Sequence, residues 1–175
     1  MRNHSDYGFT LIEVLVTLFV LAIGVVGAGA AQLTADRTRQ QAALTAEAAQ
    51  LAGSLAARIT ANGPVARLPD AGNPYLALGY DAVADGPPAA APTCFGSAAC
   101  DPLALAAFDL DETRLLVHGR FPGGRIAVCR DAAPWDAGTR RYRWACSGGA
   151  YAAVAIKIGW HGNDDAPAFV LMVAQ

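Results

Sequence analysis

The apolar residues of this chain are concentrated in one long run near its beginning. Between Leu11 and Ala31 the only polar residues are Glu13 and Thr17. Residues 14–31 carry no charge, and as a helix they would be about 27 Å long at 1.5 Å per residue. That length nearly matches the hydrocarbon core of a bilayer, so the pattern predicts a membrane-spanning helix.

After this run the pattern stays helical but becomes amphipathic. Apolar residues recur at spacings of three or four and so share one helix face: Leu44, Ala48, Leu51, Leu55 and Ile59. Asn62-Gly63-Pro64 is a strong stop signal. We therefore predict one helix from about residue 9 to residue 62. Its transmembrane half covers residues 9–31, and its amphipathic half covers residues 32–62.

The rest of the chain is divided by turn-forming residues, and all ten prolines lie between Pro64 and Pro167. Residues 64–92 have the composition of an irregular connection. Asp101-Pro102 is typical of a helix start, with Asp101 as the N-cap. The spacing of apolar residues beyond it predicts a short helix over residues 102–117.

Alternating positions then predict antiparallel strands over about residues 125–174. The expected strands cover residues 125–130, 141–146, 151–160 and 167–174, with glycine-rich turns between them. Such a series implies an antiparallel meander. The expected fold is therefore α+β, with a long helix packed on a small antiparallel sheet.

Composition narrows the class of protein. The chain has 175 residues, which is enough for one modest domain, and 54% of them are hydrophobic while 16% are charged. The formal net charge is −2. High apolar content with low net charge argues against disorder. A nucleic-acid-binding protein would carry a basic surface, so no nucleic-acid partner is expected.

The carboxylate of Glu13 is unusual in such an apolar helix, since inserting an acidic side chain into lipid costs a few kcal/mol. One interpretation is that the carboxylate reaches the membrane surface. The other is that a nearby cation pairs with it. If the chain were cut after Gly8, Phe9 would carry a free α-amine that is cationic at neutral pH. Glu13 is four residues further along, on the same helix face.

The segment Gly8-Phe9-Thr10-Leu11-Ile12-Glu13-Val14-Leu15 resembles the class III signal of type IV pilins and pseudopilins. The resemblance implies that residues 1–8 are a leader, and that prepilin peptidase cuts between Gly8 and Phe9 and methylates the new amine. It also implies that Glu13 pairs with an N-terminal amine in a filament. The fold would be pilin-like, with residues 63–175 as the globular head.

The four cysteines do not have the spacing of a metal site, and no metal or other cofactor is expected. An even number of cysteines beyond a membrane span suggests two disulfides in an oxidising compartment. Three pairings are possible. We favour Cys94–Cys100, which closes a small loop at the helix start, together with Cys129–Cys146, which would tie adjacent strands.

No arrangement of catalytic residues is recognisable. His118 and His161 are far apart in sequence, and Ser97 is not part of a Gly-x-Ser-x-Gly elbow. Several polar and aromatic residues have simpler structural interpretations. We interpret Asp109, Asp111 and Glu112 as a solvated helix face, residues 162–165 as a turn rather than a calcium loop, and Trp135, Trp144 and Trp160 as core aromatics.

Weaker stretches resemble the minor pilins of the PilV type, the type IV pilus modification proteins. These are residues 50–62, Phe108-Asp109-Leu110 and Pro122-Gly123-Gly124. The resemblance implies a structural subunit rather than an enzyme, which primes pilus assembly and so affects adhesion or motility. It would cross the bacterial inner membrane once, with its head in the periplasm, and reach the cell surface in the pilus. Its partners would be other minor pilins, the major pilin, prepilin peptidase, the inner-membrane assembly platform and the lipid bilayer.

Three alternatives remain at this stage. A subunit of another filament, either a minor pseudopilin of a type II secretion system or a subunit of a DNA-uptake filament, would share the same signal and fold. A secreted, disulfide-bonded binding domain would instead lose an ordinary signal peptide near Ala30, where small residues resemble a cleavage site. An enzyme is the third alternative.

Overall fold

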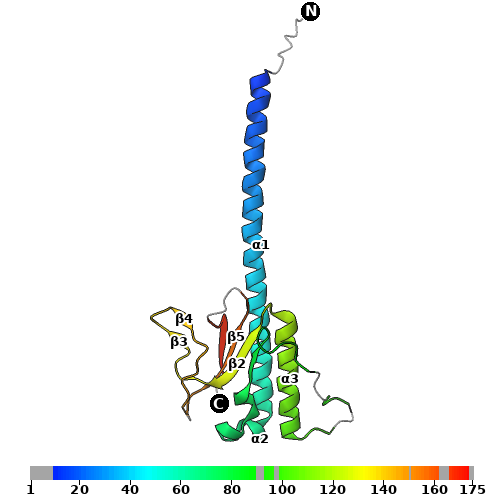
Figure 1. The fold of residues 1–175 in the computed structure, drawn as a ribbon, viewed down its shortest axis with the longest axis vertical. Coiled ribbons are helices and arrows are strands. Elements are labelled where there is room, and N and C mark those ends of the chain that lie inside the picture. Colours follow the sequence, from blue (N-terminus) through cyan, green and yellow to red (C-terminus); the bar gives the residue numbers. More distant parts are fainter. Residues whose placement is uncertain (1–9, 90–92, 97–98, 150, 162–165, 174–175) are drawn as a thin grey trace, which may run out of the picture. The chain divides into compact units, whose positions relative to one another are not determined.

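The computed structural model describes residues 10–89, 93–96, 99–149, 151–161 and 166–173. It divides into two compact units, Met1–Ala43 and Leu44–Gln175. Helix α1 (Leu11–Ala61) is continuous and ends where the stop signal predicted (Figure 1). A short helix, α2 (Gly63–Ala66), follows it.

The second unit is built on a four-stranded antiparallel sheet in the order β1-β2-β5-β6. Its strands are β1 (Gly79–Asp81), β2 (Arg125–Arg130), β5 (Val154–Gly159) and β6 (Phe169–Val173). Val128 of β2 lies opposite Ile156 of β5, which lies opposite Leu171 of β6. Two further strands, β3 (Trp135–Asp136) and β4 (Arg141–Tyr142), form a separate hairpin.

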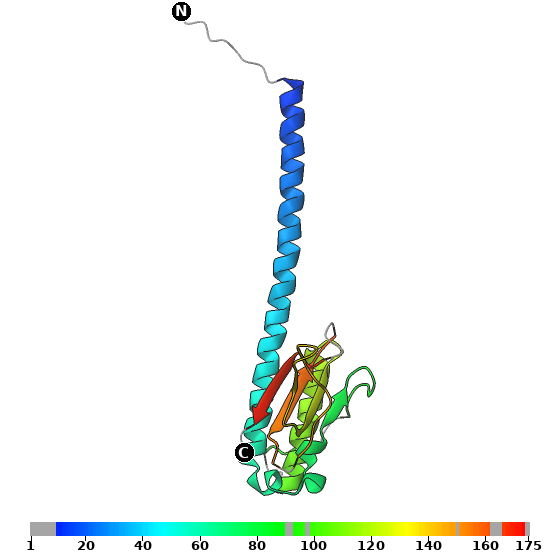
Figure 2. The same ribbon diagram turned by 90° about the vertical axis from the view of Figure 1, so that its left-hand side faces the viewer.

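Two helices cover one face of this sheet (Figures 1 and 2). The predicted stripe of α1 is buried there, including Leu51, Leu55 and Ile59. Helix α3 (Pro102–Arg120) contributes Ala106, Leu110 and Val117, and the sheet contributes Ile126, Val128, Val154, Ile156 and Ile158 to the same core. The α+β fold predicted from sequence periodicity is confirmed.

Helix α3 starts where the sequence predicted, because the Asp101 side chain accepts a hydrogen bond of 2.8 Å from the Ala104 N–H. It continues three residues beyond the predicted end at residue 117. The next proline after the helix start is Pro122, and the basic residues His118 and Arg120 favour a helix carboxyl end.

A partly buried polar network joins α1 to α3. The guanidinium of Arg58 donates to Asp109 at 3.0 Å and also to Glu112. The hydroxyl of Tyr75 donates to the other oxygen of Asp109 at 2.9 Å, and the amide of Asn62 donates to Tyr75 at 3.1 Å. Burial, followed by the neighbouring carboxylate of Asp109, raises the pKa of Tyr75 to about 12. Asp109 is only 4% exposed, so its interpretation as part of a solvated face was wrong.

The segment predicted as an irregular connection contains more structure than expected. Besides α2 it has two 3-10 turns, Asp70–Gly72 and Pro74–Ala77, and the edge strand β1. Three residues are too few to show alternation. Strand β1 exists because β2 offers it partners along its edge, where Gly79 and Asp81 lie opposite Ala127 and Arg125.

The strand predicted over residues 141–146 was mostly wrong, since only Arg141–Tyr142 is extended and its partner is β3 rather than the main sheet. The carbonyls of Arg143 and Ala145 instead accept hydrogen bonds from the Lys157 ammonium, at 2.7 and 2.9 Å. Carbonyls that turn toward one cation cannot also form a strand ladder. The meander is therefore interrupted between β2 and β5.

We expect Asp109→Asn to lower the free energy of unfolding by about 2–3 kcal/mol, because it weakens charge-assisted hydrogen bonds to Arg58 and Tyr75 in a buried place. Urea unfolding of the full chain in detergent micelles, followed by circular dichroism, measures this loss. Asp111→Asn on the same helix is the matched control. It breaks only a partly exposed pair with Arg114, so its loss should stay below about 1 kcal/mol. Equal losses for the two variants would contradict the assigned role of the network.

Candidate functional site

The first unit presents an apolar helix surface. Every large apolar side chain from Leu11 to Leu33 is exposed, from 45% for Val14 to 91% for Leu11. Among the described residues, α1 is the helix long and apolar enough to cross a membrane. Its threonines match this interpretation, since the hydroxyls of Thr17 and Thr34 donate to the carbonyls of Val14 and Ala30 at 2.8 and 3.1 Å. Polar groups bonded within the helix need no partner from the lipid.

Glu13 lies in the first turn of α1, where its N–H donates to the Thr10 carbonyl at 3.0 Å. The partial positive charge of a helix amino terminus favours a carboxylate at this position. It is the only charged residue of α1 before Asp36, which forms an exposed ion pair with Arg39 at 3.6 Å. Gly8 and Phe9, the predicted processing site, lie outside the described residues. The pairing of Glu13 with the Phe9 amine thus remains a prediction.

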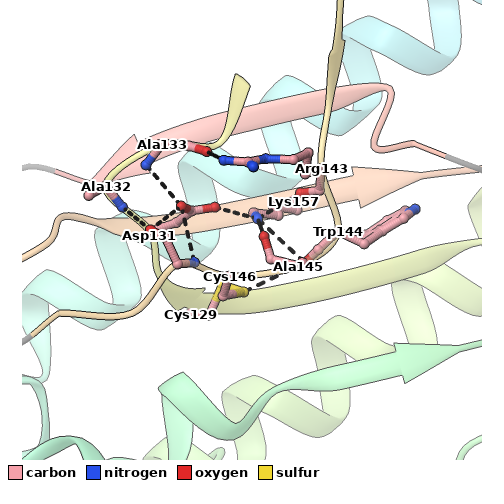
Figure 3. Close-up of a disulfide and its surroundings, with 10 residues drawn as sticks. Cys129, Asp131, Ala132, Ala133, Arg143, Trp144, Ala145, Cys146 and Lys157 are labelled. Carbon is pink, nitrogen blue, oxygen red and sulfur yellow. Dashed lines mark hydrogen bonds and ion pairs between the residues drawn. A yellow bond between two sulfur atoms is a disulfide. The ribbon is translucent and has the colours of Figure 1, made fainter. Parts of the chain in front are cut away.

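The head contains a second cluster, which the sequence analysis missed. Lys157 is the only lysine of the chain and is fully buried on β5. Its ammonium lies 2.5 Å from the carboxylate of Asp131, which is also fully buried. The main-chain carbonyls of residues 143, 144 and 145 complete its surroundings (Figure 3). A lone lysine in a strand of apolar residues is the signal that could have indicated it.

Burial on its own would raise the pKa of Asp131, but hydrogen bonds outweigh it. Lys157, the Ser147 hydroxyl at 2.7 Å and the Ala133 N–H at 3.0 Å all donate to this carboxylate. Together they hold the pKa of Asp131 at about 2. The Asp131 carboxylate is therefore charged at neutral pH, and its bonds to Lys157 and Ser147 fix the loop above β5.

Two disulfides brace the head, and their pairing is the one that the sequence analysis favoured. Cys94 is bonded to Cys100, directly before α3, and Cys129 of β2 is bonded to Cys146. Cys146 is not in a strand, so this second bond does not tie adjacent strands as expected. It attaches the segment that passes over Lys157 to the carboxyl-terminal end of β2 (Figure 3). The disulfide and the ion pair thus hold the same segment.

The remaining sequence candidates are not brought together. The Nδ1 of His118 bonds the Tyr80 hydroxyl at 2.7 Å, whereas His161 is exposed. Among the described residues, no group of three or more His, Cys, Asp and Glu side chains could hold a metal ion. Ser97 and residues 162–165 lie outside the described residues. Of the three tryptophans, Trp160 is buried in the core as expected, whereas Trp135 is 49% exposed.

The amino-terminal segment matches a known family model. Residues 3–29 match the prokaryotic N-terminal methylation motif, which is a type IV pilin-like prepilin signal. No curated protein and no solved structure matches the chain. The motif indicates a protein of the type IV pilin-like or pseudopilin class. Together with the apolar helix, it fits a membrane-anchored pilin, and it suggests a structural protein that interacts with other pilins and with prepilin peptidase.

We expect Lys157→Met to cost about 3–5 kcal/mol of unfolding free energy, because it leaves the Asp131 carboxylate buried without its cation. The pH dependence should change as well. In the unaltered protein the stabilisation from Asp131 is present above about pH 4, and it is lost as the pH falls through the folded-state pKa of about 2. This loss should shrink in the variant, because its carboxyl group no longer has a depressed pKa.

Urea unfolding between pH 2 and 7, followed by tryptophan fluorescence in detergent micelles, measures both effects. Arg125→Met is the matched control, since it removes a partly exposed cation from the neighbouring strand and should cost about 1 kcal/mol or less. If the Lys157 variant lost as much unfolding free energy between pH 4 and pH 2 as the unaltered protein, the pair would not depress the pKa of Asp131.

Proposed function

We propose that this protein is a minor pilin of the PilV type, a structural subunit that takes part in priming type IV pilus assembly. The observation that carries the proposal is the methylation motif at residues 3–29, which runs into a helix whose large apolar side chains are exposed. The disulfide-bonded α+β head supports it further. Residues 50–62, 108–110 and 122–124 supply the resemblance to this subtype.

In this proposal each segment has a distinct role. Residues 1–8 are the leader, which prepilin peptidase removes before it methylates Phe9. Residues 9–31 hold the protein in the inner membrane, residues 32–62 connect this anchor to the head, and residues 63–175 form the head in the periplasm. The protein would pass from the bilayer into the pilus, with other minor pilins, the major pilin and the inner-membrane assembly platform as partners.

The alternatives make different use of the same features. A minor pseudopilin of a type II secretion system would carry the same motif and differ in its partners. A secreted domain with a signal peptide cut near Ala30 would not need a methylation motif, so the match at residues 3–29 favours a filament subunit. An enzymatic role has the least support, because the pilin-type motif suggests a structural protein.

Deletion of the gene should distinguish the two filament systems. If the protein primes pilus assembly, we expect the number of surface pili and twitching motility to fall, while export of secreted enzymes into the medium stays unchanged. Electron microscopy of the cells and activity assays of the culture medium measure these outcomes. Normal piliation with a loss of export would assign the protein to type II secretion instead.

Glu13→Ala should leave the protein in the membrane but reduce its amount in sheared pili by about tenfold or more. Removing one partner of a buried charge pair costs about 2–5 kcal/mol, and every 1.4 kcal/mol is a factor of ten. Immunoblots of membrane and pilus fractions measure the ratio. Thr17→Val, one turn further along the same helix face, is the control and should incorporate normally. Normal incorporation of the Glu13 variant would contradict charge pairing as the basis of assembly.

A further inference from the structure

The sheet face opposite the two helices carries an aromatic and cationic surface. Residues 143–146 pass over this face, and the indole of Trp144 points away from the ion pair (Figure 3). A Cβ atom at Gly159 would lie 2.8 Å from Trp144 Cζ2, so the glycine of β5 makes room for the ring. The guanidinium of Arg125 lies over the ring, 4.4 Å from its centroid. Trp144 is thus held in place from two sides.

Two adjoining concavities share Trp144 as a wall. The first has a volume of about 570 Å³, and its polar lining comes from the β3–β4 hairpin: Asp136, Thr139, Arg141, Tyr142 and Arg143. The second has a volume of about 400 Å³ and includes Asp81, Arg125 and His161. Both volumes lie in the range of small-ligand sites, which combine aromatic walls with a few placed polar groups.

The cations of the first concavity are only partly used by the protein itself. Arg143 donates to the Ala133 carbonyl, but within the described residues the Arg141 guanidinium has no hydrogen-bond or ion-pair partner, and the side chain is exposed. One oxygen of Asp136 accepts hydrogen bonds from the N–H groups of Gly138 and Thr139, at 2.8 and 3.2 Å. The cavity therefore offers guanidinium donors and a carboxylate acceptor to a ligand.

We propose that this hairpin surface binds an acidic saccharide. A carboxylate on the sugar would bind the planar guanidinium of Arg141, since arginine matches this geometry with two parallel hydrogen bonds. Sugar hydroxyls would donate to Asp136 and bond to the Thr139 hydroxyl. The apolar face of the sugar ring would lie on the ring of Tyr142, with Trp144 as the neighbouring wall. Such binding would not require assembly into a filament.

Nucleic acid fits the same surface less well. A nucleic-acid site needs a continuous basic track, because most of its affinity comes from neutralised phosphates. Here Asp136 and Asp81 interrupt the arginines, and the net charge of the chain is −2. These carboxylates would repel closely spaced phosphates, whereas they can accept hydrogen bonds from sugar hydroxyls.

Titration of the full chain in detergent micelles, followed by tryptophan fluorescence, tests the proposal. The probes are tetragalacturonic acid, the uncharged maltotetraose and the oligonucleotide dT12. We expect saturable binding of tetragalacturonic acid, at least tenfold weaker binding of maltotetraose, and weaker binding of dT12. Arg141→Gln should weaken the binding of the acidic sugar about tenfold or more. Arg140→Gln removes the same charge next to the concavity without lining it, so it should change affinity less than threefold.

Each other outcome would overturn the proposal. Equal losses for the Arg140 and Arg141 variants would show unspecific attraction to the hairpin charge. Equal affinity for the neutral sugar would show that the guanidinium does not select a carboxylate. Tighter binding of dT12 would assign the surface to nucleic acid, and no saturable binding of tetragalacturonic acid up to millimolar concentration would rule out the saccharide site.

Discussion

The exposed apolar half of α1 is the constraint on which the rest of this protein depends. Between Leu11 and Leu33 its large aliphatic and aromatic side chains are all exposed. Burying one such side chain is worth about 1.5–3 kcal/mol, so the whole set represents tens of kcal/mol. A bilayer or the helices of neighbouring subunits can supply this burial, and both agree with a prepilin signal. In a filament, Glu13 is the residue that we propose to have a charged partner, because it is the acidic residue within this apolar segment.

The head meets a different requirement, which is to remain ordered with a modest core. Among the described residues, helices cover one face of its sheet. On the other face the segment before Cys146 is held by the disulfide to Cys129 and by the Lys157 ammonium. Buried ion pairs seldom add net stability over apolar residues, but they define geometry well. Here the pair sets the position of the carbonyls of residues 143–145, and with them the base of the β3–β4 hairpin.

Local patterns predicted the parts of the fold that depend on local interactions. The α1 stripe, the N-cap of α3 and the strands β2, β5 and β6 follow from periodicity and capping residues within a few positions. The features that the sequence did not predict depend on residues distant in the chain. Strand β1 exists only because β2 offers an edge, Asp109 is buried only because Arg58 and Tyr75 reach it, and residues 143–146 leave the extended form because of Lys157. The motif around Gly8, Phe9 and Glu13 could be identified from the sequence because its residues are contiguous. The concavities around Trp144 could not, because they combine residues from β1, β2, the β3–β4 hairpin and β5.

The most direct test of the central claim is the identity of the amino terminus. The mature protein should be purified from its native membrane, and its first residue and intact mass determined. A filament subunit of this class should begin at Phe9, with a methyl group on its amine and Glu13 four residues further along. A chain that begins near Ala31 would contradict the account, because it would describe a secreted domain that has lost both the apolar helix and Glu13.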